Sequence, residues 1–195
     1  MNKMRLGKSI ASWVYFKVLG IVAAIDVMNY REIFLDQTYK WLYERIKPNT
    51  LLLDIGASIG DTAIYFSMNL NVKEVWSYEA DDKRYRKLLE SIVHSRFSKI
   101  RPFHSRVQSL QDVLSKVVYQ NAPVAIKCDV EGDEYKLFTK ETQLRNVYAI
   151  MLEYHFGYRR LEAVLKDKGF TVSHTKARQG TLRMKEVGML TAIKA

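Results

Sequence analysis

Acidic side chains and glycines gather at the points where apolar segments of this sequence end. Asp54 closes the apolar run 51–53, and Gly56 and Gly60 follow at a spacing of four. Glu79 ends a second apolar segment, 19 residues after Gly60. A glycine turn after a strand, with a carboxylate about 20 residues later, is typical of sites that hold the ribose of a nucleotide-like ligand. The spacing therefore predicts such a site, with glycines that let the backbone approach the ligand.

A second acidic cluster follows the apolar run that begins at Ala122. Four carboxylates lie within six residues there: Asp129, Glu131, Asp133 and Glu134. Asp133 and Glu134 fall in the first turn of an expected helix, where acids complement the helix dipole. Asp129 and Glu131 lie at the strand end, and we expect them to face the same crevice as the glycine turn. The alternative for these two is a purely structural role.

Strands and helices must alternate to position these groups. The hydrophobic pattern predicts strands near 50–54, 73–79, 99–105, 122–127, 147–155, 170–175 and 187–193. It predicts helices from 61, over 82–93 and 108–118, from about 133, and over 158–168. Pro102 cannot donate a ladder hydrogen bond, so its strand belongs at a sheet edge.

The first 47 residues precede this pattern, and we treat 1–47 as an N-terminal helical extension and 48–195 as the domain that carries these motifs. For residues 1–25 three interpretations stay open. They are a helix packed on the domain, a membrane-surface helix with aromatic residues at the interface, and a cleaved signal peptide. The pattern of apolar and charged residues over 30–47 predicts an amphipathic helix that ends at Pro48.

Composition indicates one soluble domain of 195 residues with a net charge of +10. The positive charge lies in residues 1–50, 81–106 and 159–195, so a basic shell surrounds the acidic strand ends. Such a shell favours nucleic acid, lipid headgroups or a phosphorylated substrate, and a merely solvated basic surface is the alternative. The single cysteine, Cys128, excludes an internal disulfide and favours a reducing cytosol.

The order of elements resembles the class I S-adenosylmethionine-dependent methyltransferase fold, and the motifs resemble the FkbM family within it. That family often reads D-x-G-A-N-x-G, F-E-P, K-x-D-V-E-G-x-E and E-x-H. The corresponding segments here are 54–61, 78–81, 126–134 and 152–155, with Ser58 and Ala80 as departures. The resemblance implies an α/β, Rossmann-like fold. Its mostly parallel seven-stranded sheet has the order 3-2-1-4-5-7-6, with helices on both faces.

The resemblance also implies that S-adenosyl-L-methionine is the cofactor. Glu79 would accept the ribose hydroxyls, the glycine turn would pass the methionine part, and Asp54 would help to hold the amino group. Residues near 81 and 105 would lie beside the adenine. The expected cofactor-binding residues are Asp54, Gly56, Ala57, Ser58, Gly60, Glu79, Ala80, Asp81, Ser105, Arg106 and Asp129.

Asp129, Glu131 and His155 are the expected catalytic residues on the acceptor side. His155 is a natural proton acceptor near neutral pH, whereas Asp129 with Glu131 is an alternative base pair. These carboxylates also suit a divalent cation, although we expect no metal site. The resemblance implies O-methylation of a sugar, glycan or small metabolite.

Other functions and partners stay open from the sequence. The alternatives are an RNA or DNA methyltransferase that uses the basic surface, and a non-catalytic protein that retains the fold and associates with membranes or nucleic acid. We expect a cytoplasmic protein, with an anionic membrane surface as a further partner through residues 1–28. A homodimer is compatible with the sequence.

Overall fold

The computed structural model describes residues 33–34, 36–95, 97–118, 121–175 and 186–194. The interpretations of residues 1–25 and the expected membrane contact of residues 1–28 fall outside these ranges. Within the described ranges, no helix is long and apolar enough to cross a membrane.

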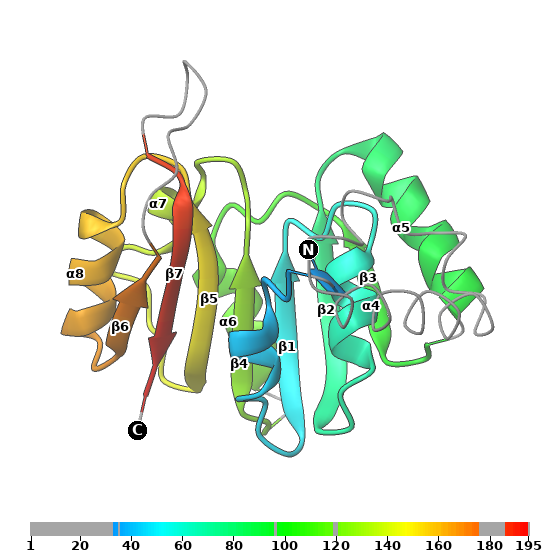
Figure 1. Cartoon of the computed structure of the whole chain (residues 1–195), viewed down its shortest axis with the longest axis horizontal. Coiled ribbons are helices and arrows are strands. Elements are labelled where there is room, and N and C mark those ends of the chain that lie inside the picture. The colour runs from blue at the N-terminus through cyan, green and yellow to red at the C-terminus, as the bar shows by residue number, and fades with distance from the viewer. Residues whose placement is uncertain (1–32, 35, 96, 119–120, 176–185, 195) are drawn as a thin grey trace, which may run out of the picture.

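A seven-stranded sheet in the order β3-β2-β1-β4-β5-β7-β6 forms the centre of the molecule (Figure 1). Neighbouring strands run parallel from β3 to β5, and β7 runs antiparallel to both β5 and β6. The strands are β1 Thr50–Ile55, β2 Val72–Glu79, β3 Ile100–His104, β4 Val124–Cys128, β5 Val147–Tyr154, β6 Thr171–His174 and β7 Gly188–Ile193. This order confirms the predicted fold, including the edge position of the strand that contains Pro102.

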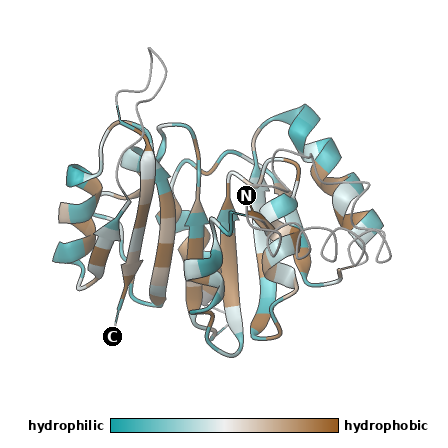
Figure 2. Cartoon of the chain, in the orientation of Figure 1, coloured by the Kyte–Doolittle hydropathy of each residue, from teal (hydrophilic) through white to brown (hydrophobic). Residues whose placement is uncertain are grey.

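Helices cover both faces of this sheet. They are α3 Lys40–Tyr43, α4 Asp61–Ser67, α5 Asp82–Ser95, α6 Leu110–Val118, α7 Glu134–Leu137 and α8 Arg159–Asp167. Leu51 and Leu53 point to the core shared with α6, α7 and α8. Leu52 points to the other core, shared with α3 and α4. Because the central strands β1 and β4 are buried on both faces, most of their residues are apolar and do not alternate with polar ones (Figure 2). Asp54 and Lys127 are the charged exceptions.

The predicted helix over 30–47 is wrong for most of its described part. Gln37 adopts a left-handed conformation with φ 55°, and only Lys40–Tyr43 forms an α-helix. The apolar residues that suggested a helix are nevertheless buried beside β1 and α4: Ile33, Tyr39, Leu42 and Ile46. Tertiary burial, rather than helical periodicity, therefore sets the conformation of this segment.

The strand order reverses between β1 and β4, which are neighbours in the sheet although two strands separate them in the sequence. The carboxyl ends of parallel strands meet at one edge, and a crevice opens where the order reverses. The loops after β1, β2, β4 and β5 therefore gather at that edge.

Candidate active site

A cleft of about 690 Å³ lies at the carboxyl ends of these strands. Most of the predicted cofactor-binding residues line it: Gly56, Ala57, Ser58, Glu79, Ala80, Asp81, Ser105, Arg106 and Asp129. Glu131 also lines it, whereas Asp54, Gly60 and His155 are not among the described residues that do. The predicted residues therefore come together around one cavity, with three of them behind its wall.

The glycines of the first turn lie against other parts of the protein, and only at Gly56 is the near atom a backbone atom. Gly56 has φ +78°, and a Cβ atom there would lie 1.8 Å from the carbonyl oxygen of Asp129. Gly60 has φ +97°, and its Cβ atom would lie 2.7 Å from Leu88 Cδ1. Gly56 also lines the cleft, so its close contact with Asp129, just after β4, accompanies the expected approach of the backbone to a ligand. Gly60 packs against α5.

Glu79 is buried and is held in place from both sides. Its Oε2 accepts a hydrogen bond from the backbone N–H of Ser58, and its Oε1 accepts one from that of Asp81, each at 2.8 Å. Each carboxylate oxygen has two lone pairs. Within the part of the chain that the structure describes, one acceptor position therefore remains on each oxygen, which suits two neighbouring hydroxyl groups.

Asp54 lies behind the cleft and contacts two residues that line it. Thr62 Oγ1 donates to Asp54 Oδ2 at 2.7 Å. The Lys127 ammonium lies 3.1 Å from Asp54 Oδ1, but the pair lacks the alignment of a hydrogen bond, so Oδ1 has no hydrogen-bond donor among the described residues. Asp54 therefore acts on the cleft through Thr62 and Lys127.

Lys127 is a buried cation on the cleft wall. Its Nζ donates a hydrogen bond to the carbonyl oxygen of Gly56 at 2.7 Å. Burial lowers the pKa of Lys127, but the negative charges of Asp54 and Asp129 outweigh burial, and the net effect raises the pKa above its ordinary value. The side chain therefore stays charged in the fully buried site.

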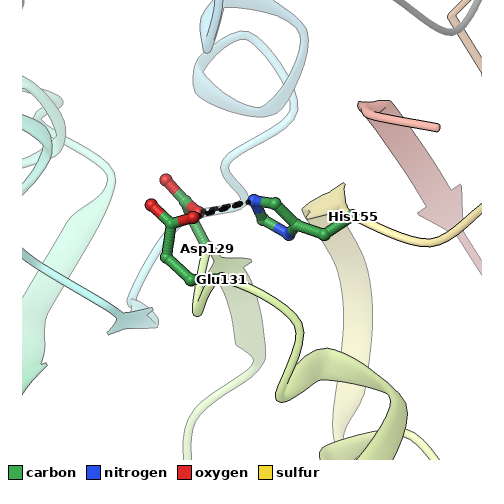
Figure 3. A group of neighbouring side chains, drawn as sticks. All are labelled: Asp129, Glu131 and His155. Carbon is green, nitrogen blue, oxygen red and sulfur yellow. Dashed lines mark ion pairs between the residues drawn. The ribbon is translucent and has the colours of Figure 1, made fainter. Parts of the chain in front are cut away.

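The three predicted catalytic side chains point toward one another (Figure 3). His155 Nε2 lies 3.9 Å from Asp129 Oδ1 and 3.5 Å from Glu131 Oε2. The side chain of His155 is 4% exposed, whereas those of Asp129 and Glu131 are 30% and 62% exposed. The carboxylates therefore face the cleft, and the imidazole supports them from behind.

Glu134 fixes His155 from the other side. Its Oε1 accepts a hydrogen bond from the backbone N–H of His155 at 2.9 Å and contacts His155 Nδ1 at 3.2 Å. Its Oε2 accepts a hydrogen bond from the backbone N–H of Gly132 at 2.9 Å. Because a carboxylate oxygen only accepts, the shared proton belongs on Nδ1. Burial lowers the pKa of His155, but Glu134 and then Asp129 raise it more, so the net effect is a raised pKa.

Glu134 lies in the first turn of α7, as expected, but this fully buried residue also has specific partners that the sequence did not indicate. The shortness of α7, a single turn, leaves little dipole to complement. Lys127 was also missed as a site residue, although a lone cation in an apolar strand was a usable signal. Nothing in the spacing distinguished Thr62, which is buried in the first turn of α4.

Basic side chains stand at the rim of the cleft. Arg106 Nε donates to Asp133 Oδ2 at 2.9 Å, and Lys136 Nζ donates to Asp133 Oδ1 at 2.7 Å. The hydrogen bond from Lys136, followed by that from Arg106, lowers the pKa of Asp133. Arg84 and Lys87 of α5 also line the cleft.

A second hollow of about 830 Å³ adjoins the acidic cluster. Phe156, next to His155, is 54% exposed there. The hollow also contains Tyr135, Arg159 and Arg160. It combines an exposed aromatic ring with positive charge.

No protein-family model matches the sequence, and no curated protein matches it either. Solved structures do match. A protein of the NADB-Rossmann superfamily from Streptococcus agalactiae has 14% identity over 80% of this chain and 67% of its own, with a TM-score of 0.59. A candidate tRNA (m1A22) methyltransferase from Streptococcus pneumoniae, solved with S-adenosyl-L-methionine, has 15% identity over 82% of this chain and 73% of its own, with a TM-score of 0.58.

A further match is TrmK from M. capricolum, solved with S-adenosyl-homocysteine. It has 12% identity over 88% of this chain and 69% of its own, with a TM-score of 0.58. At these identities the likeness concerns the fold, and the FkbM resemblance stays a prediction. Together with the strand order, these structures establish that the chain has the Rossmann-like fold of class I methyltransferases.

Proposed function

We propose that this protein is an S-adenosylmethionine-dependent methyltransferase that methylates a hydroxyl group of a sugar, glycan or small metabolite. The observation that carries the proposal is the buried carboxylate of Glu79 on the cleft wall. Backbone amides hold it on both sides, and both oxygens keep an acceptor position for a ribose diol. The fold and the ligands bound to two of the similar structures support the same cofactor.

Different residues of the cleft suit each part of this cofactor. Glu79 accepts the ribose hydroxyls, and Ala80, Asp81, Ser105 and Arg106 surround the adenine side. Gly56, Ala57 and Ser58 line the methionine side. Lys127 and Asp61 contribute opposite charges to that wall, which suit a carboxylate and an amino group. The bound cofactor would supply an electrophilic methyl group on a sulfonium centre.

The acceptor side needs a group that aligns a hydroxyl and takes its proton. Asp129 is our candidate base because its carboxylate lines the cleft and is partly exposed. Glu131 lies beside it and holds the acceptor. His155 stands behind both carboxylates and orients them, so we assign it a positioning role.

Binding and turnover test this proposal separately. Isothermal titration of the full-length protein with S-adenosylmethionine should give one site per chain, and no binding would overturn the proposal. Transfer of a labelled methyl group should then be measured against cell extract split into glycan, lipid and nucleic-acid fractions. Asp129→Asn should abolish transfer but keep the protein folded, and Asp112→Asn on the exposed face of α6 is the matched control.

The hollow beside the acidic cluster supports RNA methylation as a second candidate function. Phe156 is exposed, Arg159 and Arg160 line the hollow with it, and bases of single-stranded RNA stack on such aromatic rings. Two similar structures are described as tRNA and rRNA methylating proteins, from Streptococcus pneumoniae and Streptococcus thermophilus.

Arg159→Ala combined with Arg160→Ala distinguishes this candidate from the first. If RNA is the acceptor, the label enters the nucleic-acid fraction, and this double variant lowers RNA affinity and its salt dependence. If a glycan or metabolite is the acceptor, the RNA fraction stays unlabelled.

Membrane contact through residues 1–28 and homodimer formation also stay proposals. Flotation with anionic vesicles, with and without residues 1–28, tests the first, and release by salt indicates a charge-driven contact. Light scattering tests the second.

A further inference from the structure

We propose that Asp129, Glu131 and His155 form a binding site for a divalent transition-metal ion such as Mn²⁺. This departs from our expectation of no metal site. The binding of the ion stands by itself, whereas its use in orienting an acceptor hydroxyl rests on the proposed function.

The ligand atoms of these three side chains are already close together. One oxygen from each carboxylate and one nitrogen of His155 lie within 4.8 Å of one another. Two ligands that each lie about 2.1 Å from an ion are about 3.0–3.4 Å apart at octahedral or tetrahedral angles. The observed distances from Nε2, 3.9 Å to Asp129 and 3.5 Å to Glu131, therefore need only a small closure, which these two partly exposed side chains can supply.

His155 offers a nitrogen ligand for a metal ion. Its side chain is 96% buried, and Glu134 occupies Nδ1. The tautomer with the proton on Nδ1 directs the Nε2 lone pair at Asp129 and Glu131. Both contacts of Nε2 are longer than a hydrogen bond. Metal-binding histidines characteristically donate their second ring N–H to a carboxylate or carbonyl, and Glu134 has that position here.

Three acceptor groups therefore face one point, and a cation would satisfy all of them. The set of one imidazole nitrogen and two carboxylate oxygens suits a transition metal better than Ca²⁺, which prefers an all-oxygen site. Glu131 also holds a left-handed conformation with φ 52°, which is uncommon for a residue other than glycine. Its Oε2 lies 3.5 Å from His155 Nε2, although the side chain remains exposed.

Three protein ligands leave coordination positions open. Asp129 and Glu131 line the cleft, so an open position would face the cavity in which the acceptor must lie. A hydroxyl bound there would lose its proton more easily, because a bound metal ion lowers the pKa of a coordinated oxygen.

The test is to titrate the metal-free full-length protein with Mn²⁺. The electron paramagnetic resonance signal of free Mn²⁺ measures how much of the ion is bound. We expect one ion per chain. Glu131→Gln, at the most exposed of the three ligands, should weaken binding at least tenfold without affecting folding. His155→Gln should do the same, with folding checked by its urea midpoint. Glu134→Gln should weaken binding about 10–100-fold, as loss of such an outer partner does.

Asp133→Asn is the matched control for binding. Asp133 belongs to the same acidic stretch, but its carboxylate faces Arg106 and Lys136. Equal loss of Mn²⁺ binding in Asp133→Asn and Glu131→Gln would show only diffuse attraction and would overturn the site. Absence of a bound ion would also overturn it and would indicate that the cluster holds a proton instead.

Separate measurements distinguish failure of the proposed metal site from failure of the proposed methyltransferase function. S-adenosylmethionine binding is measured in EDTA, and Mn²⁺ binding is measured without S-adenosylmethionine. A protein that binds the cofactor but not the ion lacks the metal site, whereas a protein that binds the ion alone lacks the proposed methyltransferase function.

Discussion

Lys127 Nζ donates a hydrogen bond to the carbonyl oxygen of Gly56 at 2.7 Å, so β4 holds the turn that follows β1. Lys127 is also the register partner of Asp54 across these two strands, and the two side chains form a fully buried ion pair. The lysine thus joins the ends of two strands at the point where the strand order reverses. The shape of the cleft wall depends on this cation.

Lys127→Met should lower the free energy of unfolding by about 3–5 kcal/mol, because it leaves the Asp54 carboxylate buried without a counter-charge. Urea denaturation followed by circular dichroism measures the loss. Adding Asp54→Asn to Lys127→Met should recover part of it, since the uncompensated charge is then removed.

Lys136→Met provides the comparison for that loss. Lys136 pairs with Asp133 on the surface and is 77% exposed, so its removal should change stability by no more than about 1 kcal/mol. Equal losses in the two lysine variants would contradict the structural role of Lys127.

Gly56→Ala should destabilise the protein more than Gly169→Ala. Both glycines are left-handed, with φ +78° and +81°, so each variant loses about 1–2 kcal/mol from backbone strain. Only at Gly56 would the new Cβ atom meet backbone, 1.8 Å from the Asp129 carbonyl oxygen, whereas Gly169 has open space. Overpacking should add about 1–3 kcal/mol at Gly56. Thermal unfolding of the pair measures the difference, and similar midpoints would refute it.

The strands were predictable because their causes are local or nearly so. A continuous apolar run such as 51–53 has few alternatives to a doubly covered strand, and Pro102 by itself places its strand at an edge. The seven-stranded order followed from the family resemblance, and the pairing of strands then confirmed it.

The contacts within the site and the conformation around Gln37 could not be predicted, because they depend on residues that are distant in the sequence. Glu134 binds His155, 21 residues later, and no spacing rule connects the two. Gln37 interrupts a segment whose periodicity is helical, because burial against α4 and β1 outweighs local preference. The sequence pattern located Gly56 but did not show its close contact within the protein, since the nearest atom is the carbonyl oxygen of Asp129, just after β4.

Glu79→Gln should weaken S-adenosylmethionine binding at least tenfold. The NH2 group that replaces one oxygen donates instead of accepting. It therefore cannot accept the hydrogen bond from the N–H of Ser58 or of Asp81, and the cleft loses one acceptor. Equilibrium dialysis gives the affinity. Glu74→Gln on the same strand, where Glu74 pairs with Arg101 outside the cleft, should bind like the original protein. Unchanged binding in Glu79→Gln would remove the main support for the proposed cofactor.

Cys128 should report the opening of the whole sheet. It is the single cysteine of the chain, it is buried, and it lies on β4 between β1 and β5. Iodoacetamide can reach its thiol only when these central strands separate, and central strands open with about the global free energy of unfolding. Labelling of the native protein should therefore be at least about 1,000-fold slower than that of the protein in urea.

Lys127→Met makes this measurement decisive. If the variant loses about 3–5 kcal/mol by global destabilisation, labelling of Cys128 should accelerate at least about 100-fold, whereas Lys136→Met should label at the original rate. The acceleration must match the stability loss found in urea, because both report the same opening. If Cys128 of the unaltered protein is labelled fast, and if low urea does not change that rate, β4 opens locally. The cleft wall that Lys127 holds would then be far less rigid than its buried ion pair implies.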